Sequence, residues 1–576
     1  MSKHGFLRLG DWRRPLLLGA AVLLTACQPQ SESKAESAAE ATSEAPLTPS
    51  PYGHYLAARQ AEVERDNSRA ADLLAVTIAE DPDNLDLLNE SFLLLASEGR
   101  IEEASQAAER IDALDPKSPT AGMVLAARDM IAGDYKTADL RLAKLPPEGV
   151  NRLVLPMARA WLVLANKGPD EALKVLDELK AIPGLEPMVH LHAGAILDVA
   201  NRIPAAEAEF KRLVEAEGTT LRVVEIVGNF YQRHGTPAQA RAVYDKFLAE
   251  NPESTSLEVP MAALAAGKAP APVIADVRDG LAETFFNLAS ILSREEVIDT
   301  AMVFLRVSLA LKPDYPIAQT LLGEMLAGQG RTADSVAAYR KVAPNSSFAW
   351  PARLEVAKGL DEIDRTDEAI EMLHAMIEER KDRSDAATTL GNILRSHERF
   401  EEAAAAYDIA VARIEKPRPE NWPLFYSRGI ALERIKQWDR AEVDFKRALE
   451  LEPEQPYVMN YLAYSWIEQG RHFDEALKML ERAVDLRPED GYIVDSLGWV
   501  YYRLGRYDKA VVTLERAVEL EPADPTITDH LGDAYWKAGR KNEARYQWRR
   551  ALLFDPEEDQ VAPIQAKVER GLVGGT

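Results

Sequence analysis

Cysteine and positive charge are scarce in this chain of 576 residues. Its one cysteine, Cys27, excludes an internal disulfide because there is no second thiol to pair with it. Lysine and arginine number 68 against 93 aspartate and glutamate residues, which gives a formal net charge of −25. This balance argues against nucleic acid, whose phosphates require a basic surface, and against direct adsorption to anionic lipid. A basic protein partner is compatible with it but not required.

Catalytic motifs are also missing. The sequence contains neither the phosphate-binding GxxxxGK[ST] pattern nor the GxSxG pattern that surrounds the nucleophilic serine of many hydrolases. His190 and His192 are two residues apart, so on a helix they point to different sides and cannot share a metal as the two histidines of HExxH do. We therefore expect no enzymatic activity, no metal and no cofactor.

What the chain does have is a small residue that returns about every 34 positions. A period of 34 is typical of helix–turn–helix units of the tetratricopeptide kind. The positions are Ala70, Ala104, Ala138, Ala172, Ala206, Ala240, Ala301, Ser335, Ala369, Ala403, Ala441, Ala476, Ala510 and Ala544.

The unit that starts at Gly491 resembles the tetratricopeptide consensus at nearly every diagnostic position, with Leu497-Gly498, Tyr501, Ala510 and Pro522. Small residues let two antiparallel helices approach closely, and large apolar residues spaced i, i+3, i+4 fill the seam between them. Proline ends the second helix because it lacks an N–H and clashes with the preceding turn. The sequence predicts an all-α tetratricopeptide-repeat superhelical solenoid of about 14 units, or about 28 repeat helices.

The predicted units divide the chain into two arms. An N-terminal arm covers residues 51–254 and a C-terminal arm covers residues 282–558, separated by an Ala/Pro-rich insertion at 255–281. Residues 559–576 form a capping helix, from Val561 to Arg570, and a tail, because the last repeat needs a covered outer face. The units start near residues 51, 85, 119, 153, 187, 221, 282, 316, 350, 384, 422, 456, 491 and 525.

The first 50 residues do not fit the repeat. Basic residues precede a short apolar run, and the run ends in Leu24-Thr25-Ala26-Cys27, which is typical of a secretory signal peptide over residues 1–26. This ending resembles the bacterial lipobox, in which the cysteine is lipidated; the alternative is an ordinary signal peptide with an incidental cysteine. Residues 27–50 are then a lipidated Cys27 followed by a disordered tether. The resemblance, with Gln28 after the cysteine, implies an outer-membrane lipoprotein facing the periplasm, with the inner membrane as the alternative.

The first helix of each unit in such a solenoid lines a concave groove, and the last four units carry aromatic and polar residues there. Rigid rings with interleaved polar groups suit a peptide or helix ligand, because rings bury area at low entropic cost. The alternative is that about half of these rings pack on neighbouring helices instead. The predicted partner-binding residues are Tyr426, Tyr457, Asn460, Tyr461, Tyr464, Asp495, Trp499, Tyr502, Asp529, His530, Asp533 and Trp536.

The C-terminal arm also resembles a group of proteobacterial lipoproteins, through segments such as Asn460–Tyr464, Asp495–Trp499 and Asp529–Asp533. The best-understood type binds a periplasmic carboxyl-terminal processing protease and helps it to degrade cell-wall hydrolases. The resemblance implies a membrane-anchored adaptor or scaffold that binds a protein or peptide, with such a protease and cell-wall hydrolases as the partners. A second reading is an assembly factor of an envelope complex, such as a pilotin-like or export-system subunit, with no link to proteolysis.

Overall fold

A computed structural model of the chain describes residues 50–572, except 117, 216–219 and 252–253. The predicted signal peptide, the lipidation site Cys27 and all of the predicted tether but its last residue lie outside the described residues. Within them the chain forms 30 α-helices and two short 3-10 helices, and no strand. The prediction of an all-α chain is confirmed, and 28 of the α-helices form 14 consecutive pairs.

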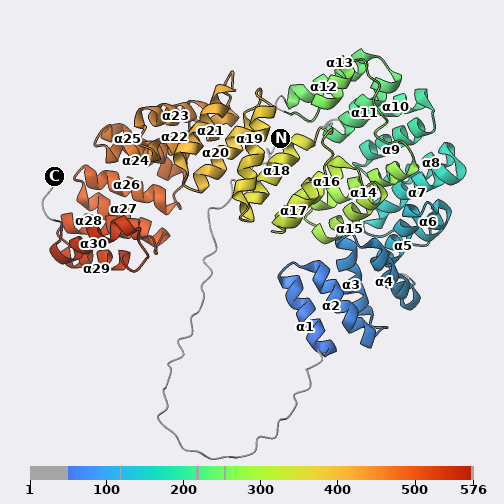
Figure 1. The fold of residues 1–576 in the computed structure, drawn as a ribbon, viewed down its shortest axis with the longest axis horizontal. Coiled ribbons are helices and arrows are strands. Elements are labelled where there is room, and N and C mark those ends of the chain that lie inside the picture. Colours follow the sequence, from blue (N-terminus) through green and yellow to red (C-terminus); the bar gives the residue numbers. More distant parts are fainter. Residues whose placement is uncertain (1–49, 117, 216–219, 252–253, 573–576) are drawn as a thin grey trace, which may run out of the picture. The chain divides into compact units, whose positions relative to one another are not determined.

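Six helix pairs make up the N-terminal arm, with each pair forming one repeat (Figure 1). Their bounds are α1 (Pro51–Val63), α2 (Asn67–Glu80), α3 (Leu85–Ser97), α4 (Ile101–Leu114), α5 (Pro119–Ile131), α6 (Tyr135–Leu142), α7 (Asn151–Lys167), α8 (Pro169–Leu176), α9 (Glu186–Val199), α10 (Ile203–Glu215), α11 (Leu221–His234) and α12 (Pro237–Glu250). A short 3-10 helix, η1 (Asp177–Ala181), follows α8.

The insertion contains one helix, α13 (Glu258–Ala265), and eight further pairs follow it. Their bounds are α14 (Val277–Arg294), α15 (Ile298–Leu311), α16 (Pro316–Gly328), α17 (Thr332–Tyr339), α18 (Ala349–Glu362), α19 (Thr366–Glu379), α20 (Asp385–Ser396), α21 (Phe400–Ala412), α22 (Trp422–Arg434), α23 (Trp438–Leu451), α24 (Pro456–Glu468), α25 (Phe473–Leu486), α26 (Gly491–Arg503), α27 (Tyr507–Leu520), α28 (Pro525–Lys537) and α29 (Lys541–Ala551). The 3-10 helix η2 (Pro419–Asn421) precedes α22, and the chain ends with α30 (Glu558–Arg570).

The periodic small residues form the seam inside each pair. All fourteen are buried, and thirteen of them are alanines with no exposed surface. A glycine on the first helix lets an aromatic ring of the second helix approach closely. A Cβ added at Gly228 would lie 2.1 Å from the ring of Tyr244, and one added at Gly391 would lie 2.5 Å from the ring of Tyr407. The pairs therefore pack as the repeat pattern predicts.

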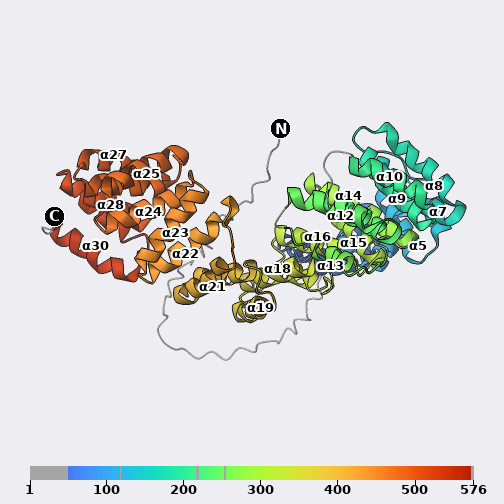
Figure 2. The ribbon, with the colours of Figure 1, turned by 90° about the horizontal axis from the view of Figure 1, so that it is seen from above.

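The first pair after the insertion packs back against the N-terminal arm. Helix α14 contacts α7 and α9, and α15 contacts α3 and α5, as two perpendicular views show (Figures 1 and 2). The approach is close, since a Cβ added at Gly280 of α14 would lie 2.3 Å from the ring of Trp161. Arg222 of α11 reaches Glu283 of α14 at 2.6 Å, and the hydroxyl of Tyr315 donates to the same carboxylate. These buried ionic contacts join segments that lie far apart in the sequence.

The buried core does not follow the arm boundary predicted at residues 255–281. One large cluster of buried apolar side chains runs from Ile101 to Ala338, across the insertion, and a second runs from Val336 to Ile564. Helix α17 contributes to both. The physical reason is the return of α14 and α15, which bury their apolar surface on helices of the N-terminal arm. Helix α14 also begins at Val277, inside the predicted insertion.

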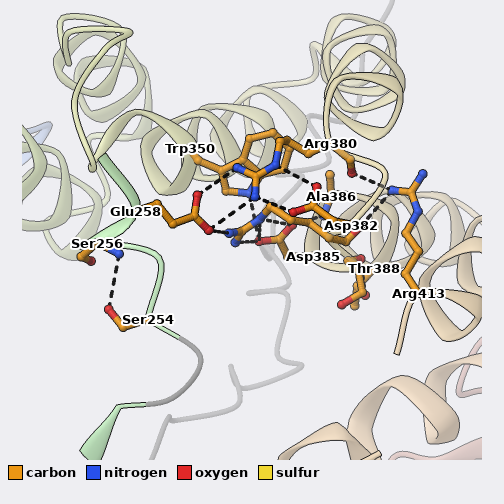
Figure 3. A network of polar contacts seen from close by, with 12 residues as sticks. Ser254, Ser256, Glu258, Trp350, Arg380, Asp382, Asp385, Ala386, Thr388 and Arg413 are labelled. Carbon is orange, nitrogen blue, oxygen red and sulfur yellow. Dashed lines mark hydrogen bonds and ion pairs between the residues drawn. The ribbon is translucent and has the colours of Figure 1, made fainter. Parts of the chain in front are cut away.

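The insertion is fixed to the C-terminal arm by a polar network around α13 (Figure 3). Glu258 at the start of α13 pairs with Arg380, at 2.9 Å, and with Arg383, at 3.3 Å, in the loop between α19 and α20. Both guanidinium groups also lie over the ring of Trp350. Arg413 donates to the main-chain carbonyls of Arg380 and Arg383, which holds the loop in place.

Candidate partner-binding groove

The predicted partner-binding residues all lie on four first helices of consecutive repeats, α22, α24, α26 and α28. Helix α24 packs beside α26, and α26 packs beside α28. The repeat thus brings together residues that are about one period apart in the sequence. Their surroundings divide them into three groups along the arm.

The first group is a packed aromatic cluster. The rings of Tyr426 and Tyr461 meet edge to face with 6.0 Å between centroids, and Tyr461 lies 5.4 Å from Phe445 on α23. Burial raises the pKa of Tyr461 to about 12. These two tyrosines hold neighbouring helices together, which is the alternative role that the sequence left open for about half of the rings.

The second group is a stack of rings centred on Trp499. The indole lies parallel to His530 of the next unit, with centroids 4.0 Å apart, and parallel to Tyr502, with centroids 4.7 Å apart. Its Nε1–H donates to Glu468 at 2.6 Å, and Arg503 pairs with the same carboxylate at 3.2 Å. The stack therefore joins α24, α26 and α28 through aromatic and ionic contacts, and Trp499 and Tyr502 stay only half-buried.

A buried acid holds the histidine of this stack. Both carboxylate oxygens of Asp495 lie 3.0 Å from Nδ1 of His530. Burial by itself would lower the pKa of His530, but the charge and hydrogen bond of Asp495, with smaller contributions from Asp529 and Asp533, outweigh it and raise the pKa. The ring under Trp499 is thus a cationic or easily protonated one.

Three further predicted residues lie on α24, the helix that also carries Glu468. Tyr457 is 37% exposed, and Asn460 and Tyr464 are half-buried. Oδ1 of Asn460 is buried and has no hydrogen-bond partner within the described residues. Burial raises the pKa of Tyr464, and the nearby Glu468 and Asp495 add to the effect. A buried amide oxygen without a partner costs free energy, so Asn460 is a polar group that the packing of α24 leaves unsatisfied.

The third group is engaged by the capping helix α30. Nζ of Lys567 lies 2.6 Å from Asp529 and 2.9 Å from Asp533, and Nε1–H of Trp548 donates to Asp533 at 2.9 Å. Trp536 packs on Trp548 with 5.4 Å between centroids. Contacts within the chain therefore occupy Asp529, Asp533 and Trp536, and their role in partner binding stays a prediction. Sequence reasoning missed Lys567, although it lies in the predicted capping helix.

Among the described residues, no three His, Cys, Asp or Glu side chains are arranged to hold a metal ion. The same part of the chain has no helix that is both long and apolar enough to cross a bilayer. His190 and His192, which the sequence separates, take different partners: His190 contacts Glu209 at 2.6 Å, and His192 accepts a hydrogen bond from Trp161 at 3.1 Å.

Comparison with known proteins agrees with the repeat. Residues 357–419 and 426–491 match the family described as Tetratricopeptide repeat, and residues 498–539 match one described as TPR repeat. The TPR repeat-containing protein PA4667 of Pseudomonas aeruginosa strain PAO1 is 27% identical over 193 residues. That alignment covers 33% of this chain and 31% of PA4667, so the chain matches about a third of its relative's length.

Solved structures of other repeat proteins are similar at low identity. YrrB, described as a TPR protein with an unusual peptide-binding site, aligns over 34% of this chain and 97% of its own, with 21% identity and a TM-score of 0.27. The Cut9–Hcn1 hetero-tetramer of the APC/C aligns over 92% of this chain and 99% of that chain, with 14% identity and a TM-score of 0.37. The paired helices and the matched repeats define a tetratricopeptide-repeat solenoid, a fold that is typically a non-catalytic scaffold for protein–protein interaction.

Proposed function

We propose that this protein is a membrane-anchored adaptor that faces the periplasm and captures a protein partner in the groove of α22, α24, α26 and α28. The observation that carries the proposal is the stack in which the half-buried rings of Trp499 and Tyr502 lie on the buried ring of His530. Half-exposed rings on a rigid helix array are suited to serve as binding hot spots.

The N-terminal arm supports this choice of groove. Its first helices α3, α5, α7 and α9 already contact α14 or α15 of the same chain. A partner would have to displace a whole repeat to reach them, whereas the stack around Trp499 needs no such rearrangement.

The partner that we propose is a periplasmic carboxyl-terminal processing protease, which the adaptor brings together with cell-wall hydrolases. The similarity of the C-terminal arm to lipoproteins of that type supports this assignment. The alternative function is an assembly factor or scaffold of an envelope complex without proteolysis, such as a pilotin-like or export-system subunit. Partners captured from membrane extracts distinguish the two: a protease with hydrolases supports the first, and pilus or export subunits support the second.

The groove is tested by truncating its rings. Tyr464→Ala and Trp499→Ala should each weaken capture of the partner by about 2 kcal/mol or more, roughly thirtyfold in affinity, because both remove a central aromatic contact. Tyr546→Ala is the matched control, since Tyr546 on α29 is 62% exposed and lies outside the groove. Melting temperatures must be measured on all three variants. Unchanged affinity together with lost stability would show that the rings are only core and that the partner binds elsewhere.

The anchor is tested at Cys27. Cys27→Ser removes the thiol that the lipid would be attached to, so lipid labelling should disappear and the protein should be soluble or unprocessed. Labelling with a fatty acid measures lipid attachment, and membrane fractionation shows whether the protein is soluble. A variant that stays with the outer membrane like the wild type would contradict the lipoprotein assignment.

A further inference from the structure

The Ala/Pro-rich insertion lies on the sixth repeat in the way that a bound peptide would. Nδ2 of Asn229, on α11, donates to the carbonyl of Ala271 at 2.8 Å, and its Oδ1 accepts the N–H of Val273 at 3.3 Å. One side-chain amide thus binds a carbonyl and an N–H of the same extended stretch. The prolines at 270 and 272 favour that extended backbone, because proline disfavours helical angles in the residue before it.

Neighbouring groups hold and orient this contact. Nε of Arg233 donates to Oδ1 of Asn229 at 2.9 Å, which turns Nδ2 toward the carbonyl of Ala271. Lys312 donates to the carbonyl of Val273 at 3.0 Å, and Gln232 donates to the carbonyl of Pro260 at 3.0 Å. The contacts of Asn229, Lys312 and Gln232 with the insertion are all made to its main-chain atoms. They therefore depend on the course of its backbone more than on its side chains.

The segment is lightly held compared with a core element. Ala271 and Pro272 are exposed, as are residues 265–269 before them, and burial resumes at Ile274. A cavity of about 500 Å³ lies beside the segment, and Tyr244, Tyr315 and Phe348 are among the residues that line it. Release of residues 270–273 would therefore break a few hydrogen bonds and expose one partly buried apolar side chain, Val273.

We propose that the sixth repeat is a second peptide-binding site, which residues 270–273 close in the resting chain, and that it takes an extended proline-containing segment of a partner protein in their place. The site lies on α11, so the proposal does not depend on the groove around Trp499. Residues 270–273, which occupy the site, define the ligand chemistry: small residues, alternating prolines, and a main-chain carbonyl and N–H placed for Asn229.

The probe is a fluorescent synthetic peptide with the sequence of residues 268–275, Lys-Ala-Pro-Ala-Pro-Val-Ile-Ala. A released full-length variant carries Pro270→Gly, Ala271→Ser, Pro272→Gly and Val273→Ser, which removes the preformed extended backbone. Because a tethered segment competes at millimolar effective concentration, the released variant should bind the probe about tenfold more tightly than the wild type, or better. Adding Asn229→Leu should abolish that gain, whereas adding Asn460→Leu, in the other groove, should leave it intact.

Hydrogen exchange on the unaltered protein provides a test that does not depend on the folding of variants. Excess unlabelled probe should accelerate exchange at the amide of Val273, since it displaces the segment from Asn229. A released variant that melts like the wild type yet gains no affinity would overturn the proposal, as would a gain that survives Asn229→Leu. Unchanged exchange at Val273 in saturating probe would also overturn it and would leave the insertion as a structural strap.

Discussion

Two buried histidines illustrate how the surroundings shift the pKa of the same residue type in opposite directions. His192 in the N-terminal arm accepts the Nε1–H of Trp161 at its Nδ1, and burial lowers its pKa to about 4. His530 in the C-terminal arm faces the carboxylate of Asp495, which raises its pKa in spite of burial. The first is a neutral core side chain, and the second, beneath the ring of Trp499, takes up a proton more readily than a free imidazole.

Acid should destabilise the core around His192. The folded-state pKa lies below the unfolded value, so the stability that neutral His192 contributes is present above about pH 6.5 and is lost as the pH falls toward 4. The full loss is on the order of 3 kcal/mol. Hydrogen exchange of α7 and α9 at about pH 7.5 and about pH 5 measures the first part of this loss, about 2 kcal/mol. His192→Gln, which keeps an acceptor for Trp161 but does not titrate, should remove most of the pH dependence; an unaltered pH profile would contradict the assignment.

The periodic small residues could be read from the sequence, but the partners of the polar groove residues could not. Burial of Ala510 or Ala544 follows from the period alone, because each repeat places that position in the same seam. The pairing of Asp529 and Asp533 with Lys567 depends on how α30 folds over the last repeat. No spacing in the sequence encodes that contact, and the same holds for Asn229 and Ala271.

The capping helix α30 covers the end of the solenoid and also forms ion pairs with acidic side chains of the last repeat. Nζ of Lys567 is the cation nearest to Asp533, whose pKa is raised to about 6 by burial and by Asp529, against the opposing charge of Lys567. Gln560 donates to Thr526 at 3.2 Å, which fixes the start of α30 on the same helix, α28. The cap thus supplies a lysine cation in direct contact with two acids of the last repeat.

Removal of that cation should loosen the last repeat. Lys567→Met leaves two partly buried carboxylates unpaired, and we expect a loss of about 2–3 kcal/mol near neutral pH after allowing for partial exposure of the pair. A raised carboxyl pKa stabilises the folded state below the unfolded value and loses that effect as the pH rises through the folded pKa, so the defect should shrink below about pH 6. Hydrogen exchange of the amides in α28 and α30 at neutral and acidic pH measures this loss of stability.

Lys537→Met is the control for this variant, because Lys537 is an exposed lysine at the end of the same helix, α28. Asp533→Asn combined with Lys567→Met should recover part of the loss, since it removes one of the unpaired charges. Equal destabilisation by Lys567→Met at neutral and acidic pH would show that the lysine acts through its stem packing alone.

Helix starts followed the repeat closely, and the largest departure, that of α14, has a physical cause. The predicted starts near 316, 422, 456, 491 and 525 coincide with the first residues of α16, α22, α24, α26 and α28. Helix α14 starts earlier, at Val277, because its additional turn packs on the N-terminal arm, where Gly280 meets Trp161. Packing between repeats far apart in sequence lies outside what a local period can predict.

For the whole molecule, the two largest of the four buried clusters predict two main unfolding units that do not coincide with the two arms of the sequence. The first of these two clusters ends and the second begins within α17. Because each repeat mainly contacts its neighbours, the boundary between two buried clusters is where cooperativity should break. The insertion does not supply that point, since Arg222 and Glu283 join the repeats on either side of it.

A matched pair of overpacking variants tests this division. Ala172 and Ala510 occupy the same position of their repeats, both have no exposed surface, and they belong to different clusters. Ala172→Trp and Ala510→Trp should each cost about 1–3 kcal/mol, because a large ring cannot fit the helix seam without displacing it. Hydrogen exchange in increasing denaturant should show Ala172→Trp lowering protection from α4 to α16 and Ala510→Trp lowering it from α18 to α29. If either variant lowered protection equally on both sides of α17, the chain would unfold as one unit and the division at α17 would be wrong.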